Sequence, residues 1–150
     1  MSYLFKGVFI MDSTNFETFF KKVWDKSNIL IDANNFNLKT LTVILFLGRH
    51  QIELGEEITF NLNQIRELLG LEDSIYTYRR IENAIFYFKI NFFKFKLTNN
   101  RERIFHAIKA FEKPMNDIYF NKEWRVEIDS VLRERILQSD FHDLFTEMEK

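Results

Sequence analysis

The sequence contains no cysteine, one proline and four glycines in 150 residues. Without cysteine there are no disulfide bonds, no thiol nucleophile and no cysteine-ligated zinc site. The longest apolar segment, residues 38–47, is interrupted by Lys39, Thr40 and Thr42, and it is far shorter than the roughly 20 residues of a membrane-spanning helix. The apolar N-terminus lacks a small-residue cleavage site and does not predict a signal peptide. We therefore expect a cytoplasmic protein without a membrane partner.

Candidate catalytic and metal-binding residues are also few. His50, His106 and His142 lie far apart in the sequence and show no metal-ligand spacing. Two acidic pairs, residues 56–57 and 72–73, each precede a predicted structural element, where acidic side chains stabilise helix or loop ends. There is no glycine-rich phosphate loop and no serine nucleophile motif. The sequence supports no enzymatic activity, no metal site and no small-molecule cofactor.

Phenylalanine is abundant, with 18 residues, in a chain that is 46% hydrophobic and 29% charged. Aromatic side chains bury large areas at little cost in rotamer freedom, so many phenylalanines with few chain-breaking residues predict a packed, regularly structured protein. The length suits one domain, and no repeat, low-complexity run or linker divides the chain. We expect a single domain over residues 1–150.

Charge is segregated along the chain although the net charge is only -1. Residues 74–113 hold nine Lys or Arg residues and three acidic ones, whereas the segments before and after them are both net acidic. A concentrated basic block is what contact with the phosphate backbone of a nucleic acid requires. The distribution therefore favours nucleic-acid binding more than the net charge does.

Two helices are expected in the first third of the chain. Thr14 and Glu17 form a capping box, and apolar residues follow at helical spacing to about residue 26. The second helix is expected over residues 38–47. It is apolar nearly all round, which is typical of a buried helix, and Gly48 ends it.

The next segment predicts a short strand followed by a helix-turn-helix. Residues 58–60 form the strand, and Asn61 begins a capping pattern for a helix that Gly70 ends. Ser74 can cap the second helix, which is expected over residues 75–88. The inward face of that helix is expected to contain Ile75, Tyr78, Ile81 or Glu82, Ile85 and Phe88.

After residue 92 the apolar pattern changes from helical spacing to strict alternation. Residues 93–97 predict a strand, 98–101 a turn and 104–111 a returning strand, so that basic side chains lie on the tip and one face of a hairpin. Residues 118–120 are a candidate third strand. The C-terminus is expected to be helical, with one apolar face made by Trp124, Ile128, Val131, Leu132 and Ile136 and another by Phe141, Leu144, Phe145 and Met148.

This order predicts a winged helix-turn-helix, an α+β fold, with additional N- and C-terminal helices and the β-hairpin as its wing. A helix fits the major groove of B-DNA, where Arg reads guanine and Asn reads adenine, and basic wing residues contact the flanking phosphates or the minor groove. The residues expected to contact DNA are Tyr76, Thr77, Arg79, Arg80 and Asn83 on the helix and Lys94, Lys96, Asn99, Asn100, Arg101 and Arg103 on the hairpin.

These basic residues have alternative interpretations that involve no DNA. Arg79 and Arg80 are also consistent with a solvated helix face, on which Arg79 pairs with Glu82 three residues later. Lys94 and Lys96 are also consistent with protection of an edge strand against aggregation. The tip residues would suit any solvated turn.

Four segments resemble the winged-helix domains of plasmid and phage replication initiators. They are ITFNLNQIRELLG at 58–70, YRRIENAI at 78–85, the long hairpin at 92–111, and DIYFNKEW at 117–124, where such domains leave the sheet. The resemblance covers about residues 38–137. It implies double-stranded DNA as the partner, bound by monomers on repeated origin sites or by dimers on inverted repeats.

Three functional hypotheses follow. The first is sequence-specific double-stranded DNA binding in the initiation of plasmid or phage replication. The second is a dimeric transcriptional regulator or plasmid partition adaptor, in which the stripe 141–148 of a C-terminal helix over residues 138–150 forms a homodimer seam; packing of that stripe onto the protein's own core is the alternative. The third belongs to another class, a winged-helix protein-interaction module without DNA binding.

Overall fold

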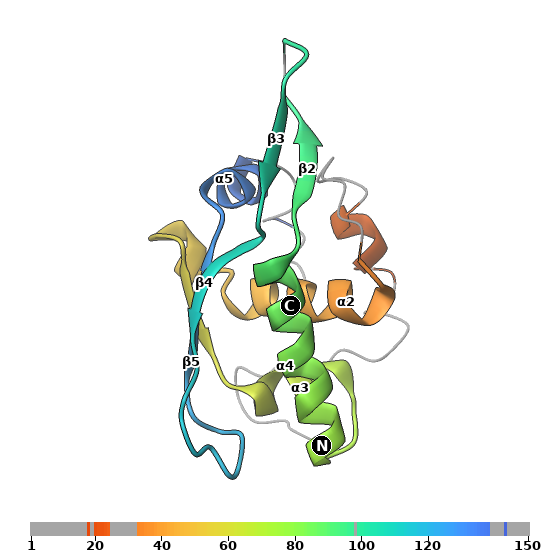
Figure 1. Ribbon diagram of the computed structural model, residues 1–150, viewed down its shortest axis with the longest axis vertical. Helices are drawn as coiled ribbons and strands as arrows, with labels where there is room; N and C mark the ends of the chain where they lie inside the picture. The colour runs from red at the N-terminus through yellow and green to blue at the C-terminus, as the bar shows by residue number, and fades with distance from the viewer. Residues whose placement is uncertain (1–17, 19, 25–32, 98, 139–142, 144–150) are drawn as a thin grey trace.

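The computed structural model describes residues 18, 20–24, 33–97, 99–138 and 143, which form a mixed α+β fold of helices and two antiparallel sheets (Figure 1). The elements run in the order α2 (Asn35–Leu47), the short 3-10 helix η1 (Gln51–Glu53), β1 (Glu57–Phe60), α3 (Leu62–Leu69), α4 (Ile75–Ile90), β2 (Phe93–Lys96), β3 (Glu102–Phe105), β4 (Ile108–Glu112), β5 (Trp124–Ile128) and α5 (Ser130–Gln138). The α+β class predicted from the sequence is confirmed.

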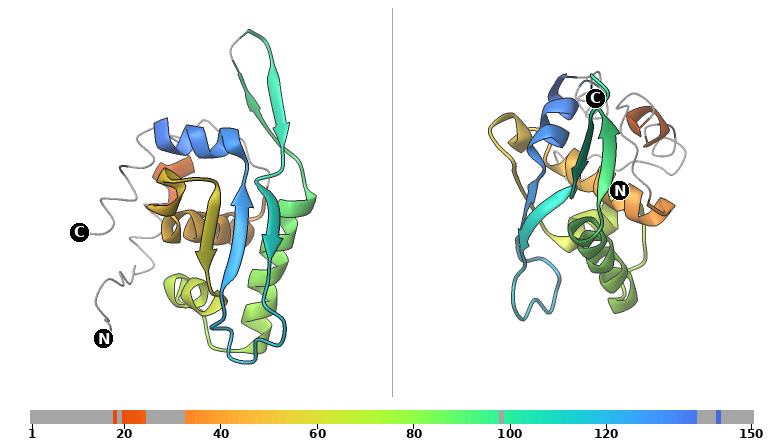
Figure 2. Two further views of the ribbon diagram at one scale, coloured as in Figure 1. Left: turned by 90° about the vertical axis from the view of Figure 1, so that its left-hand side faces the viewer. Right: turned by 45° about the horizontal axis from the view of Figure 1, so that its top comes forward.

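The larger sheet has the strand order β1-β5-β4, with every neighbour antiparallel. Its inner face packs against the helices, and the alternating residues Trp124, Val126 and Ile128 of β5 are all buried there. The smaller sheet is the β2–β3 hairpin, which projects beyond the body of the protein (Figures 1 and 2). The larger sheet closes the core, whereas the hairpin forms an arm whose inner face still contributes the buried residues Phe93, Phe95 and Phe105.

Helix α2 is the centre of the core, as its apolar sequence predicts. Residues 40–46 are all buried, and the hydroxyls of Thr40 and Thr42 donate to the carbonyls of Phe36 and Leu38 four residues earlier, so that no hydroxyl is left unsatisfied. Gly48 follows the helix where a Cβ would lie 2.6 Å from the side chain of Ile58. Only glycine fits this close approach of the helix end to β1.

The helix-turn-helix formed by α3 and α4 is built by the capping residues that the sequence predicts. The side chains of Asn61 and Gln64 each accept from the other's backbone N–H in a complete capping box. Gly70 ends α3 in the left-handed region at φ 66°. Ser74 then caps α4 by accepting from the backbone N–H of Thr77. Both helix starts and the turn between them are confirmed.

Several predicted elements are wrong after α4. The single returning strand expected over 104–111 is two strands, because the chain leaves the hairpin at His106 and joins β5 at Ile108. Residues 118–120 form no strand. Residues 124–128 form strand β5, so the helical face expected from Trp124 onward begins only in α5. Pairing between strands that are distant in the sequence, β5 with β1 and β4 with β5, decides where these strands form.

The structure describes the predicted N- and C-terminal helices only in part. Thr18 and residues 20–24 are helical, and Phe20 and Val23 are buried in the core. The rest of the helix expected over 14–26, and the apolar stripe Phe141, Leu144, Phe145 and Met148, lie outside the described residues. Within the described ranges, no helix has the length and apolar character needed to cross a membrane.

Candidate nucleic-acid interface

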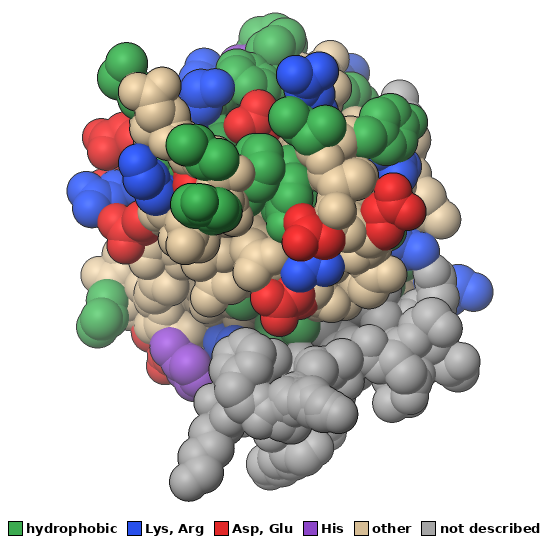
Figure 3. Space-filling view, turned by 90° about the horizontal axis from the view of Figure 1, so that it is seen from below, with side chains coloured by type: hydrophobic (Ala, Val, Ile, Leu, Met, Phe, Trp, Pro, Cys, Tyr) green, Lys and Arg blue, Asp and Glu red, His purple; other side chains and the backbone are tan. Residues whose placement is uncertain are grey.

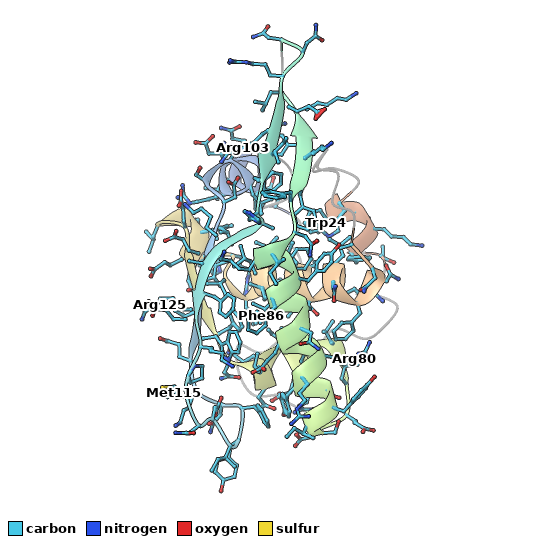
Figure 4. The ribbon with its side chains drawn as sticks, in the orientation of Figure 1. Trp24, Arg80, Phe86, Arg103, Met115 and Arg125 are labelled. Carbon is cyan, nitrogen blue, oxygen red and sulfur yellow. The ribbon has the colours of Figure 1, made fainter. Side chains whose placement is uncertain are left out.

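The outward face of α4 brings together four of the residues expected to contact DNA. Tyr76, Arg79, Arg80 and Asn83 are all exposed and lie on one stripe of the helix, since they are spaced three or four residues apart. The stripe is bordered by Phe86, which packs edge-on against a phenylalanine of β4 at 4.9 Å between ring centroids. Figure 4 shows the labelled Arg80 and Phe86 on opposite sides of α4.

The two arginines of this stripe differ in how they are held. The guanidinium of Arg80 lies over the Phe36 ring, 3.9 Å from its centroid, and 5.9 Å from that of Tyr76. Arg79 forms no ion pair with any described residue, and the expected alternative pairing with Glu82 is not among the ion pairs of the described chain. One cation is therefore fixed against an aromatic ring while the other is uncompensated.

Thr77 is placed differently from the expectation. Its side chain is only 6% exposed, and its hydroxyl oxygen lies 3.2 Å from the Ser74 hydroxyl, inside the cap of α4. Ile75, expected to face inward, is 59% exposed instead. The buried face of α4 thus starts at Thr77 and Tyr78, and the first residues of the helix project beyond the core.

A partly buried polar network around Tyr78 joins α4 to α3. The Tyr78 hydroxyl lies 2.8 Å from Asp73 Oδ1, 3.1 Å from Asn63 Oδ1 and 3.0 Å from Arg66 Nε, which donates to it. Burial away from water, and next the hydrogen bond to Asp73, raise the pKa of Tyr78 above its usual value of 10.0. Sequence reasoning missed this network, because periodicity identifies Tyr78 only as a core residue.

The β2–β3 hairpin presents its basic residues on two faces. Lys94 and Lys96 point outward and are exposed, and neither forms an ion pair with a described residue. Arg101 and the left-handed residues Asn99 and Asn100 make the exposed tip. These five residues are placed as the sequence predicts for a solvent-facing arm.

Arg103, expected to contact DNA, instead lies on the inner face of the hairpin. Its guanidinium donates to both carboxylate oxygens of Asp129, at 2.6 and 3.3 Å. Asp129 is 3% exposed and also caps α5 by accepting from the backbone N–H groups of Val131 and Leu132. Arg103 therefore anchors the hairpin to the body of the protein, a role that only the register of β2 with β3 reveals.

The hairpin and the start of α4 lie at opposite ends of the protein. The hairpin leaves the C-terminal end of α4, a helix of 16 residues, which corresponds to a length of about 24 Å. The end that carries Tyr76 and Arg79 instead adjoins residues 113–123, which connect β4 to β5 and are called here the β4–β5 loop (Figures 1 and 2). The hairpin is thus not the element beside the first turns of α4.

The β4–β5 loop is tied to the helix-turn-helix by Phe120. Its ring stacks on Tyr78 at 3.9 Å between centroids and 10° between planes, and its carbonyl accepts from the backbone N–H of Asn63. The loop also carries the exposed side chains of Met115, Ile118 and Tyr119. Sequence reasoning missed this loop as a surface element because it took residues 118–120 for a strand.

The outer face of the larger sheet has the opposite electrostatic character. Lys109 Nζ lies 2.6 Å from Glu56 and 3.5 Å from Glu127, and Arg125 lies within 4 Å of Glu57 and of Glu123. The hydrogen bond to Glu56 raises the pKa of Lys109 above 10.5. The cations of this face are matched by carboxylates, whereas Arg79, Lys94 and Lys96 form no ion pair with the described residues. Among the residues that the structure describes, no group of three or more His, Asp or Glu side chains could hold a metal ion.

Comparison with known proteins identifies a likeness of fold. No protein-family model matches the chain, and no curated protein matches it by sequence. Among solved structures, the chain is similar to the crystal structure of selenomethionine derivatives of domains 2 and 3 of RctB, with a TM-score of 0.50 and 16% sequence identity. The match covers 68% of this chain and 46% of that chain, less than half of its length. At this identity the likeness concerns the fold alone.

Proposed function

We propose that this protein is a winged helix that binds double-stranded DNA, with α4 as the recognition helix. A winged helix places one strand between its first two helices and two strands after its recognition helix, in a three-stranded sheet. The order α2, β1, α3, α4, β4, β5 and the sheet order β1-β5-β4 match that arrangement. The β2–β3 hairpin is then an insertion between α4 and β4, and the β4–β5 loop occupies the position of the wing.

The observation that carries the proposal is the contrast between the two faces of the protein. The exposed stripe of α4 presents Arg79 and Asn83, whose side chains make no ion pair or hydrogen bond with the described residues, beside Arg80, which is held against the Phe36 ring. Arg and Asn are the side chains that pair with guanine and adenine edges in the major groove. The opposite face, formed by the larger sheet, neutralises its cations with carboxylates. A polyanion is therefore expected to bind the first face in preference to the second.

The hairpin would add phosphate contacts at the other end of α4. Lys94 and Lys96 are exposed on its outer face, and Arg101 lies at the tip. Contacts of this kind carry little sequence information but increase affinity in a salt-dependent manner. Because Arg103 pairs with Asp129, we assign it to positioning the arm and not to contact with DNA.

A role in plasmid or phage replication initiation in the cytoplasm is the biological setting we propose. Its support is the sequence resemblance of about residues 38–137 to the winged-helix domains of replication initiators. A dimeric regulator or partition adaptor is the alternative with the same DNA chemistry. Comparing the sedimentation of the whole chain with that of a version lacking residues 138–150 tests the homodimer seam of this alternative, since an unchanged oligomeric state removes it.

The test is a binding assay with two matched double variants. We expect Arg79→Ala with Arg80→Ala to weaken binding by about 1–3 kcal/mol for each base that the variant can no longer read. The control, Lys109→Ala with Arg125→Ala, removes the same charge from the sheet face and should leave affinity nearly unchanged. Titrations at about 50 and 200 mM salt should show the steep loss of affinity that several phosphate contacts produce. Full, sequence-selective binding by the α4 variant would overturn the assignment of the recognition helix.

A second candidate function is a protein-interaction module without DNA binding. Its support is the end of the protein viewed in Figure 3, where hydrophobic side chains gather between charged ones. The exposed apolar residues of α4's first turn and of the β4–β5 loop are Ile75, Tyr76, Met115, Ile118 and Tyr119. Absence of any binding to a mixed-sequence duplex at about 50 mM salt would favour this function over the first.

A further inference from the structure

The tip of the β4–β5 loop exposes three large apolar side chains to solvent. Met115 is 83% exposed, Ile118 76% and Tyr119 78%. A tip composed this way loses favourable burial energy as long as it remains in water. The arrangement therefore indicates that the loop covers something else when the protein acts.

The backbone of the loop is nevertheless well held. The Asp117 carboxylate accepts from the backbone N–H groups of Asn121 and Lys122, at 3.3 and 3.2 Å. Phe120 adopts a left-handed conformation at φ 58°, which turns its ring onto Tyr78. A preorganised loop loses less conformational entropy when it binds than a flexible one does.

The loop carries four charged side chains, the lysines Lys113 and Lys122 and the carboxylates Asp117 and Glu123. The carboxylate of Asp117 is occupied by backbone donors, and Glu123 lies 3.4 Å from Arg125. Lys113 and Lys122 are exposed and form no ion pair with the described residues. An apolar tip flanked by two lysines that form no ion pair within the described chain is complementary to a groove lined by phosphates.

The position of the loop fits the same partner as α4. Phe120 ties it to Tyr78 in the second turn of α4, so the loop lies beside the end of the helix whose residues would read base edges. The groove next to the major groove is the minor groove. Side chains such as Met and Ile can enter it as wedges between base steps and kink the duplex.

We propose that the β4–β5 loop enters the minor groove and inserts Met115 and Ile118 as an apolar wedge that bends the DNA, while Lys113 and Lys122 contact the phosphates on either side. This inference rests on the proposed function, since it requires α4 to lie in the neighbouring major groove. It assigns the bending to a loop that makes no contribution to base reading.

The test compares DNA bending by the full chain and by two variants. The duplex is one that the wild-type protein selects from a pool with a randomised centre, and fluorophores at its two ends report the bend by energy transfer. The wedge variant is Met115→Ser with Ile118→Ser. The control is Leu54→Ser, which removes an apolar side chain that is 92% exposed near the start of β1, at the other end of the sheet.

We expect the wild type and the control to bend the duplex by at least about 20°, as apolar wedges do. The wedge variant should retain the selected sequence but leave the duplex nearly straight. A straight duplex with the wild type, or an equal bend with the wedge variant, would overturn the inference while leaving DNA binding intact. If the wild type selects no duplex, the proposed function fails together with the inference. An unchanged bend with altered sedimentation of the wedge variant would assign the tip to a second copy of the chain instead.

Discussion

Asp129 offers a quantitative test of how the hairpin is attached, because its carboxylate has two separable tasks. It caps α5 through the N–H groups of Val131 and Leu132 at 3.0 and 2.9 Å, a contribution of about 1 kcal/mol. It also receives two hydrogen bonds from Arg103. The carboxylate is 4% exposed and the guanidinium 33%, so the pair should contribute less than the roughly 3–5 kcal/mol lost when a fully buried pair is broken.

From these values we expect Asp129→Ala to lower the free energy of unfolding by about 2–4 kcal/mol. Asp129→Asn keeps an oxygen for the cap but loses the charge, and should cost about 1–2 kcal/mol. Urea denaturation followed by the fluorescence of the two tryptophans measures both. A double-mutant cycle that combines Asp129→Asn with Arg103→Met isolates the interaction free energy of the pair.

The cycle has a clear refuting outcome. If the losses in unfolding free energy caused by the two substitutions add to within about 0.3–0.5 kcal/mol, Arg103 and Asp129 do not interact in solution. The hairpin would then not be anchored by this pair. Equal losses for Asp129→Asn and Asp129→Ala would instead contradict the capping role. Unchanged DNA affinity of Arg103→Met under native conditions would agree with its position on the inner face of the hairpin.

Three further predictions concern the core and the helix-turn-helix. Gly48→Ala should lower the free energy of unfolding by about 1–3 kcal/mol through overpacking against Ile58, whereas Gly55→Ala, with no atom within 4 Å of its Cβ, should have little effect in the same urea titration. Asn61→Ala should cost about 1 kcal/mol by removing the capping box of α3, and no loss would contradict that cap. The raised pKa of Tyr78 stabilises the fold below pH 10.0, a contribution that is lost as the pH rises through the folded-state pKa. Tyr78→Phe should therefore flatten the decline of stability above pH 10.0, and an unchanged decline would refute this role.

The local features of the fold were predictable because the forces that form them act over a few residues. The capping box at Asn61, the left-handed Gly70 and the Ser74 cap each involve partners within one helical turn. The buried helix α2 follows in the same way from its unbroken apolar composition. The two faces of α4 were predictable except at Thr77, which is buried, and at Ile75, which is exposed.

The errors in the strands and at Arg103 share a physical cause, since each depends on a partner distant in the sequence. The alternation of residues 124, 126 and 128 fits a strand, but the spacing of Trp124 and Ile128 also fits a helix that continues into later residues. Pairing with β1 makes this segment a strand. Arg103 could face either side of the hairpin until Asp129, 26 residues later, fixes it inward. Long-range hydrogen bonds and ion pairs produce no periodic pattern from which they could be predicted in the sequence.

The sequence by itself determined a basic segment, a capped helix-turn-helix and a hairpin, because charge, caps and periodicity are properties of neighbouring residues. Only the tertiary structure decided where these parts lie relative to one another. The pairing of β4 with β5 separates the hairpin from the larger sheet, and the stack of Phe120 on Tyr78 places a different loop beside the first turns of α4. Strand pairing and aromatic packing join residues tens of positions apart, and that geometry decides which surface accompanies the candidate recognition helix.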